Sequence, residues 1–203
     1  MITIVDMKIG NIGSVVSGFR RVGQEPVVTD DPADVARADR LVLPGVGAFG
    51  DGMASLREKR LVEPLRRHVL ERRLPLLGIC LGMQLLTERG EEHGKHEGLG
   101  VLPGGSVRLA PRNDLRVPNI GWCDVAPRDG AHLFPGNGRE AFYFAHGYHV
   151  ACADPANVAA TIDYGGEIAA AVERGTVFGV QFHPEKSQDA GLDVLARFAG
   201  ADA

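Results

Sequence analysis

The segment PLLGICLGMQLL, residues 75–86, predicts a buried strand that runs directly into a helix, with one cysteine at the junction. Leu76 to Ile79 is a short apolar run, and the apolar residues after Gly82 continue at helical spacing. Gly78 and Gly82 flank Cys80 in the pattern G-x-C-x-G. Such glycines let strand and helix approach closely, and the sharp turn exposes the side chain at its apex. We therefore expect an α/β fold that presents a thiol at the edge of its sheet.

Around this segment, the first half of the chain alternates strands and helices. Short apolar runs predict strands at residues 2–5, 26–29, 41–43 and 76–79, and helical spacing predicts helices at 12–22 and 61–70. This alternation indicates a mostly parallel central sheet with helices on both faces.

The second half has many glycines and prolines between short apolar runs. Runs at 105–109, 119–125 and 141–145 predict antiparallel additions to the sheet, runs at 168–173 and 177–182 are expected to complete it, and a last helix is expected at 189–198. No internal repeat or low-complexity linker interrupts the pattern, so residues 1–203 are predicted to form one domain.

Composition excludes several classes of protein. The net charge of −4 argues against nucleic-acid binding, which usually needs a basic face. No stretch reaches the roughly 20 apolar residues of a membrane span, and the first ten residues lack the basic start of a signal peptide. Three cysteines give no disulfide framework. We expect a cytoplasmic protein with no membrane contact.

His93 and His96 lie in a polar run, EEHGKHEG, without a third ligand at a recognisable spacing, so no metal or other cofactor is expected.

The position of Cys80 favours a reactive thiol. A helix N-terminus favours the thiolate, which is the nucleophilic form, and the N–H of Leu81 would point toward a developing oxyanion. The alternative is an inert buried cysteine packed between two glycines, which is common for a lone cysteine. Cys123 and Cys152 lack the glycine pair and the helix start, and are expected to be structural.

A base for this thiol is available in VFGVQFHPEKS, residues 177–187. Alternate residues of a strand face the same way, so Glu185 can hold one ring nitrogen of His183 and leave the other for the cysteine proton. His183 follows an apolar strand, and functional side chains of parallel sheets gather at the carboxyl ends of strands.

The glycine-rich run GVGAFG, residues 45–50, matches G-x-G-x-x-G and offers the alternative of a dinucleotide-binding oxidoreductase. That fingerprint belongs in the first strand–helix unit, with an acid closing the next strand. Here it follows the third predicted strand, and the acid at that distance, Glu71, lies in a predicted helix. We expect these amides to complete an oxyanion hole instead.

Taken in order, PGVG after a strand, GICLGMQ, and HPE near the end of the chain resemble the class I (triad) glutamine amidotransferases. Finer features are similar to the glutaminase subunits of imidazole glycerol phosphate synthase, in histidine biosynthesis: DMKIGN at residues 6–11, LPGVGAFGDGM, NIGW, YFAHGYHV and HPEKS. Two positions depart from that family's usual pattern. Met7 replaces a tyrosine, and Gly147 replaces a serine, which puts one substrate contact in doubt.

The resemblance implies roles for particular residues. Cys80 would attack the side-chain amide of glutamine, His183 would move the proton, and Glu185 would orient His183. The backbone of Val46, Gly47 and Leu81 would form the oxyanion hole. The glutamine site would contain Gly45, Gly47, Gln84 and His146. Gln84 also lies one helical turn after Cys80 on the same face, although it could be an ordinary exposed glutamine.

The resemblance also implies a partner, because these motifs leave no site for an ammonia acceptor. The expected partner is a (β/α)8-barrel cyclase subunit that forms a heterodimer and receives ammonia directly. Asn11, Trp122 and Lys186 would face it, with Trp122 equally compatible with the core. The alternatives are a glutaminase for a different synthase, a partner-independent amide hydrolase of the same fold, and a degenerate regulatory subunit.

Overall fold

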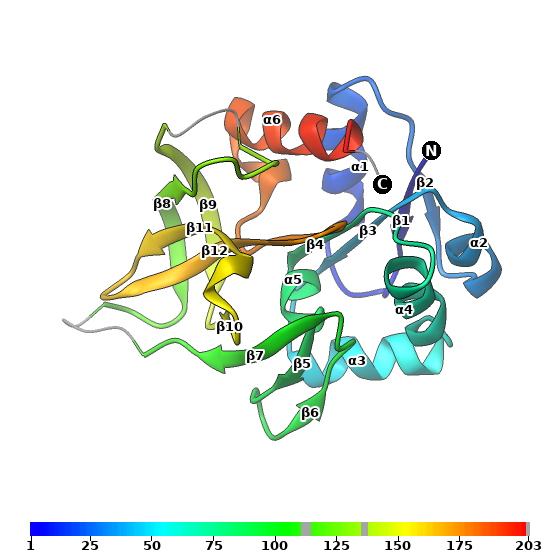
Figure 1. Cartoon of the computed structure of the whole chain (residues 1–203), viewed down its shortest axis with the longest axis horizontal. Coiled ribbons are helices and arrows are strands. Elements are labelled where there is room, and N and C mark those ends of the chain that lie inside the picture. Colours follow the sequence, from blue (N-terminus) through cyan, green and yellow to red (C-terminus); the bar gives the residue numbers. More distant parts are fainter. Residues whose placement is uncertain (111–114, 135–137, 202–203) are drawn as a thin grey trace.

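Within residues 1–110, 115–134 and 138–201, which the computed structural model describes, nine strands form the main sheet in the order β2-β1-β3-β4-β13-β12-β11-β8-β9. Its parallel half consists of β1 (Ile2–Val5), β2 (Val27–Thr29), β3 (Arg40–Gly45), β4 (Leu76–Cys80) and β13 (Val177–Val180). The central strand β4 pairs in parallel with both β3 and β13. The carboxyl ends of these three strands therefore meet at one edge of the sheet (Figure 1).

The antiparallel half continues the same sheet through β12 (Glu167–Arg174), β11 (Val158–Asp163), β8 (Asn119–Pro127) and β9 (Glu140–His146). A second, four-stranded sheet has the order β10-β7-β5-β6, made by β10 (Tyr148–Cys152), β7 (Leu102–Arg108), β5 (Thr87–Gly90) and β6 (His96–Glu97). Short 3₁₀ turns, η1 (Pro155–Asn157) and η2 (Pro184–Lys186), connect strands and helices. The predicted parallel sheet with antiparallel additions is confirmed.

Helices cover both faces of the parallel half (Figure 1). One face packs against α1 (Ile12–Arg21) and α6 (Gln188–Ala199), through a cluster that includes Phe19, Val42, Ile79 and Leu195. The other face packs against α3 (Phe49–Glu58), α4 (Val62–Leu70) and α5 (Leu81–Leu85). The short α2 (Pro32–Arg37) lies beside α4. Successive residues of the strands alternate between the two clusters, as strand geometry requires.

The predicted helices at 12–22, 61–70 and 189–198 correspond to α1, α4 and α6. No helix in the described ranges is long and apolar enough to cross a membrane.

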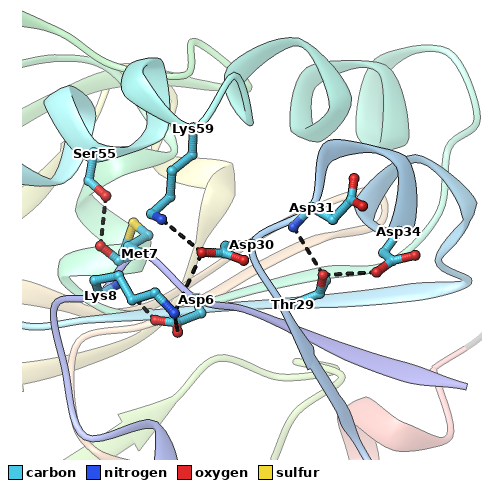
Figure 2. Close-up of polar contacts among 9 residues, drawn as sticks. All are labelled: Asp6, Met7, Lys8, Thr29, Asp30, Asp31, Asp34, Ser55 and Lys59. Carbon is cyan, nitrogen blue, oxygen red and sulfur yellow. Dashed lines mark hydrogen bonds and ion pairs between the residues drawn. The ribbon is translucent and has the colours of Figure 1, made fainter.

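The loop between β1 and α1 is held by a network of charged and polar contacts (Figure 2). Asp6 accepts hydrogen bonds from the backbone N–H and the ammonium of Lys8, at 2.7 and 2.6 Å. Asp30 lies between the ammonium groups of Lys8 and Lys59, at 3.5 and 2.8 Å. Ser55 of α3 donates to the backbone carbonyl of Met7 at 2.6 Å. These contacts fix Met7 against the end of β3, where a Cβ on Gly45 would lie only 2.7 Å from the Met7 methyl group.

Candidate active site

Cys80 occupies the last position of β4, immediately before α5, with φ 54° and ψ −109°. A positive φ is uncommon for a residue other than glycine and marks strain. The two flanking glycines make this turn possible. A Cβ on Gly78 would lie 2.7 Å from the backbone of Gly82, and a Cβ on Gly82 would lie 1.7 Å from the carbonyl oxygen of Leu43. The G-x-C-x-G pattern therefore produces the sharp turn expected of it, although α5 has only five residues and supplies a modest dipole.

His183 and Glu185 lie beside this turn. Cys80 ends β4, and His183 follows the parallel neighbour β13 by three residues, so the sheet brings them together. His183 Nδ1 is 2.9 Å from Glu185 Oε1, and the two side chains are 5% and 3% exposed. With Nδ1 committed to the carboxylate, Nε2 is the nitrogen left for the thiol.

Electrostatics keep a proton on this imidazole. Burial lowers the pKa of His183, but hydrogen bonds to Cys80 and Glu185 and the charges of both groups outweigh it and raise the pKa to about 9. Burial raises the pKa of the Cys123 thiol and raises that of Cys152 to about 11, which disfavours the thiolate at both positions.

A cavity of about 90 Å³ opens beside Cys80. Its walls are formed by the turn at Cys80 with α5, the residues that follow β3, the β9–β10 turn and the loop after β5. The lining residues are Val46, Gly47, Cys80, Leu81, Gln84, Glu92, Ala145, His146, Gly147 and Tyr148. Most of the residues proposed for the glutamine site lie here. Gly45 does not line this cavity, but it pairs in register with Cys80 and lines a smaller cavity of about 20 Å³ on the His183 side.

Gln84 is buried, 5% exposed, and not an ordinary surface glutamine. Its amide nitrogen donates to the carbonyl of Tyr148 and to the side-chain oxygen of Gln181, both at 3.0 Å. Both amide hydrogens are thus used, which leaves the Gln84 oxygen as the group that can accept from a molecule in the cavity.

His146 is held as a neutral ring. Its Nδ1 lies 2.8 Å from the carbonyl of Tyr148, and its Nε2 lies 3.2 Å from the Asn119 amide nitrogen. A carbonyl can only accept, so Nδ1 carries the hydrogen and Nε2 accepts from Asn119. Burial lowers the pKa of His146 to about 4, in keeping with a neutral ring. Because both ring nitrogens are engaged, His146 contributes a wall of the cavity and not a free hydrogen-bonding group.

The segment proposed for the oxyanion hole is exposed and glycine-rich. Val46 and Gly47 are exposed, and Gly47 has φ +101°, a conformation that L side chains rarely adopt. Gly10 packs behind this segment, since a Cβ on it would lie 3.7 Å from the backbone nitrogen of Val46. Leu81, whose N–H is the third proposed donor, lines the same cavity.

The three residues expected to face a partner are all exposed. Trp122 is 49% exposed, which decides against the core, and packs edge-on against Tyr143, with ring centroids 6.1 Å apart. The Lys186 ammonium lies 5.7 Å from the centre of the Tyr143 ring. Asn11 accepts a hydrogen bond from the backbone of Ser14 at the start of α1, and lines the 20 Å³ cavity with Lys186 and His183.

Sequence reasoning missed three residues of this site. Gln181 is fully buried with its amide nitrogen 3.7 Å from the Cys80 sulfur. Tyr143 lies between Trp122 and His183, with centroids 6.1 and 6.5 Å away. Glu92, in the polar run that contains His93 and His96, lines the cavity of about 90 Å³ and accepts a hydrogen bond from the first N–H of α3 at 2.9 Å. The prediction that His183 and Glu185 face the same way on one strand is wrong, because β13 ends at Val180 and Glu185 lies in η2, whose turn brings the carboxylate to His183 Nδ1.

In residues 1–110, 115–134 and 138–201, no three histidine, cysteine or acidic side chains gather closely enough to hold a metal ion. The arrangement places a thiol, an imidazole and a carboxylate beside a polar cavity. These are the parts needed for acyl transfer through a thioester.

The chain matches the family model Glutamine amidotransferase class-I over residues 3–199. It is 49% identical over 202 residues to the imidazole glycerol phosphate synthase subunit HisH of Rhodopirellula baltica, covering 99% of this chain and 98% of the relative. It is also 49% identical to the HisH subunit of Syntrophotalea carbinolica, covering 98% of each chain. A solved structure titled as a glutamine amidotransferase has a TM-score of 0.78, 22% identity, and coverage of 99% of this chain and 100% of its own. The structure of PurLQS from Thermotoga maritima has a TM-score of 0.76, 23% identity, and coverage of 98% and 97%.

Proposed function

Since the chain belongs to the class-I glutamine amidotransferase family, we propose that it releases ammonia from glutamine as the glutaminase subunit of an imidazole glycerol phosphate synthase, with Cys80, His183 and Glu185 as its catalytic triad. The observation that carries the triad assignment is the strained turn that presents Cys80 to the buried His183–Glu185 pair at the mouth of a polar cavity.

In the first half of the reaction, the Cys80 sulfur attacks the side-chain carbonyl carbon of glutamine. A sulfur–carbon bond forms, and the carbon–nitrogen bond breaks. His183, which holds a proton at neutral pH, gives it to the departing amide nitrogen, so that ammonia leaves and a glutamyl thioester remains. Glu185 stabilises the imidazolium and keeps Nε2 directed at the reacting atoms.

In the second half, water hydrolyses the thioester. Neutral His183 takes a proton from the water as its oxygen attacks the carbonyl carbon, and the carbon–sulfur bond breaks to release glutamate. The backbone N–H groups of Leu81 and of the Val46–Gly47 segment stabilise the oxyanion in both halves. The proximity of these backbone segments to Cys80 around one cavity supports this assignment.

The glutamine side chain must point toward Cys80, so its α-amino and α-carboxylate groups lie toward the mouth of the cavity. Glu92 is the acidic residue of the lining and matches the α-ammonium group in charge. One Glu92 oxygen is occupied by the start of α3, and the other remains for the substrate. Gln84 accepts from the substrate, Gly47 and His146 shape the walls, and Gly45 lies outside the lining, in register with Cys80.

Ammonia released into water at neutral pH is mostly protonated and no longer nucleophilic, so we propose direct transfer to a (β/α)8-barrel cyclase subunit in a heterodimer. There it would serve the synthesis of imidazole glycerol phosphate and an aminoimidazole carboxamide ribonucleotide. The surface around Asn11, Trp122 and Lys186 fits this role, because exposed aromatic and cationic side chains are typical of interface anchors. Exposed Ile120, which lies two residues before Trp122 on β8, extends the apolar part of that surface.

We further propose that the isolated subunit is slow because its oxyanion segment, Pro44–Gly47, is not set for catalysis. The segment is exposed at Val46 and contains glycines whose peptides rotate at little cost. Docking of the partner with its nucleotide would shift it to the competent arrangement, which is a coupling between two sites.

The experiment is glutamate release from glutamine, measured for this chain alone, with a barrel cyclase, and with the cyclase plus its nucleotide. Strong stimulation by the complete set supports the proposal. Rapid release by the chain alone would instead indicate a partner-independent hydrolase, and stimulation by a different synthase would reassign the partner.

A further inference from the structure

Gln181 stands directly beside the proposed nucleophile. It is the first residue after β13, and β13 pairs with β4 up to the Val180–Ile79 pair, one residue before Cys80. The Gln181 side chain is fully buried, and its amide nitrogen lies 3.7 Å from the Cys80 sulfur. This is a hydrogen-bonding distance for sulfur, in a position that water does not reach.

The orientation of the Gln181 amide follows from its neighbours. The Gln84 side chain donates to the backbone carbonyl of Tyr148, which can only accept, so a nitrogen must occupy that position. The same nitrogen donates its second hydrogen to the Gln181 oxygen at 3.0 Å. The Gln181 oxygen therefore faces Gln84, and its N–H group faces the sulfur.

We infer that Gln181 is a further catalytic residue, whose amide N–H holds the Cys80 sulfur as the thiolate and connects it through Gln84 to the substrate cavity. This inference rests on Cys80 being the nucleophile. A donor fixed in a dry site favours an anionic acceptor over a neutral one, because a bond to a charged group is the stronger of the two. The N–H faces the sulfur before glutamine binds and again when the thiolate leaves the thioester.

Other charged or titratable groups also surround the sulfur, and a test must separate their effects. His183 lies immediately before η2 and its partner Glu185 lies within η2. Neutral His146 approaches from β9, and Glu92 lines the cavity from the loop after β5. Gln181 is itself uncharged over the whole pH range. Its replacement thus removes a donor without adding or removing a titrating group.

The test compares the pH dependence of Cys80 alkylation by iodoacetamide in the wild type and in Gln181→Met, with the modified site identified by mass spectrometry. Methionine keeps the length of the side chain and removes the donor. We expect the midpoint of the alkylation profile to rise by about one pH unit and the rate at neutral pH to fall about tenfold. In the partner complex, kcat for glutamate release should fall more than KM changes.

The matched control is Ser106→Ala on β7, which removes another buried polar group, away from the glutamine-site cavity, and should leave the alkylation profile unchanged. If Gln181→Met does not fold by circular dichroism, Gln181→Leu decides, since it also removes the donor without adding a titrating group and should raise the midpoint as far. A folded variant whose profile superimposes on that of the wild type overturns the inference. Failure of the proposed function gives a different result: glutamate release would persist in Cys80→Ala, whatever the alkylation profile of Gln181→Met shows.

Discussion

The substitution Glu185→Gln tests how the orienting carboxylate works. Glu185 Oε1 accepts from His183 Nδ1 at 2.9 Å, whereas Oε2 is buried without a hydrogen-bond partner among the described residues. An amide can therefore keep its oxygen toward His183 and place its nitrogen where Oε2 was. The ring keeps its tautomer, and only the negative charge is lost.

The expected magnitude follows from that single loss. A hydrogen bond to a charged group contributes about 1 kcal/mol more than a hydrogen bond to a neutral group. This difference corresponds to about one pKa unit. The pKa of His183 should fall from about 9 to about 8. Since the imidazolium is less stabilised in every proton transfer, glutamate release by the partner complex should fall about 10- to 100-fold.

The assay is the pH profile of glutamate release at saturating glutamine in the complex, together with direct titration of His183 by nuclear magnetic resonance. Glu173→Gln is the matched control, because Glu173 also accepts hydrogen bonds through its carboxylate, but from the backbone N–H groups of His132 and Leu133. A loss near 10⁴-fold, the effect of a reversed tautomer in serine proteases, would refute the reasoning, as would a rate equal to that of the wild type.

Three further predictions concern stability, the substrate and the partner. His68 is 1% exposed, its Nε2 contacts the Pro75 carbonyl, and burial lowers its pKa from 6.5 to about 4. The unfolded chain binds this proton first, so the free energy of unfolding should decrease as pH falls from 6.5 to about 4, by about 3 kcal/mol for this residue. His68→Gln should reduce that slope in denaturant titrations, and an unchanged slope would contradict the assignment. Gly147→Ser should fold normally, since its Cβ would meet no atom closer than 3.9 Å, and should lower KM for glutamine; a higher KM would show that the hydroxyl obstructs the site. Trp122→Ala should weaken binding of the cyclase by about 2 kcal/mol in calorimetry while the isolated subunit keeps its basal rate. Unchanged affinity would remove Trp122 from the proposed interface.

The parts of the site that could be predicted from the sequence are those fixed by local geometry. Gly78 is required by backbone contacts within the turn, and Gly82 by the carbonyl oxygen of Leu43 on the neighbouring strand β3. The contact between His183 and Glu185 was predicted from the spacing of a strand, but the chain turns into η2 after His183 and brings the carboxylate to Nδ1 from there. Gln181 was not predicted, because glutamine is mostly exposed in proteins and only the pairing of β13 with β4 buries it against the sulfur.

Tertiary packing decided the elements that were not predicted. The helix α3 contains Gly50 and Gly52, which lower helix propensity, yet α3 forms because His96 and Leu85 pack directly on these two glycines. The helix after Cys80 was expected to continue through Leu86, but α5 ends at Leu85. Thr87 begins β5 instead, and its hydroxyl donates to the carbonyl of Gln84, an alternative to a further helical turn.

The central claim is that Cys80 releases ammonia under the control of a partner. The most direct measurement is glutamate release by the wild type and by Cys80→Ala, each alone and each with a barrel cyclase and its nucleotide. The account predicts slow release by the wild type alone, strong stimulation in the complete complex, and loss of that release in Cys80→Ala. Glutamate release that persists in Cys80→Ala, or that is equally fast without the partner, would contradict it.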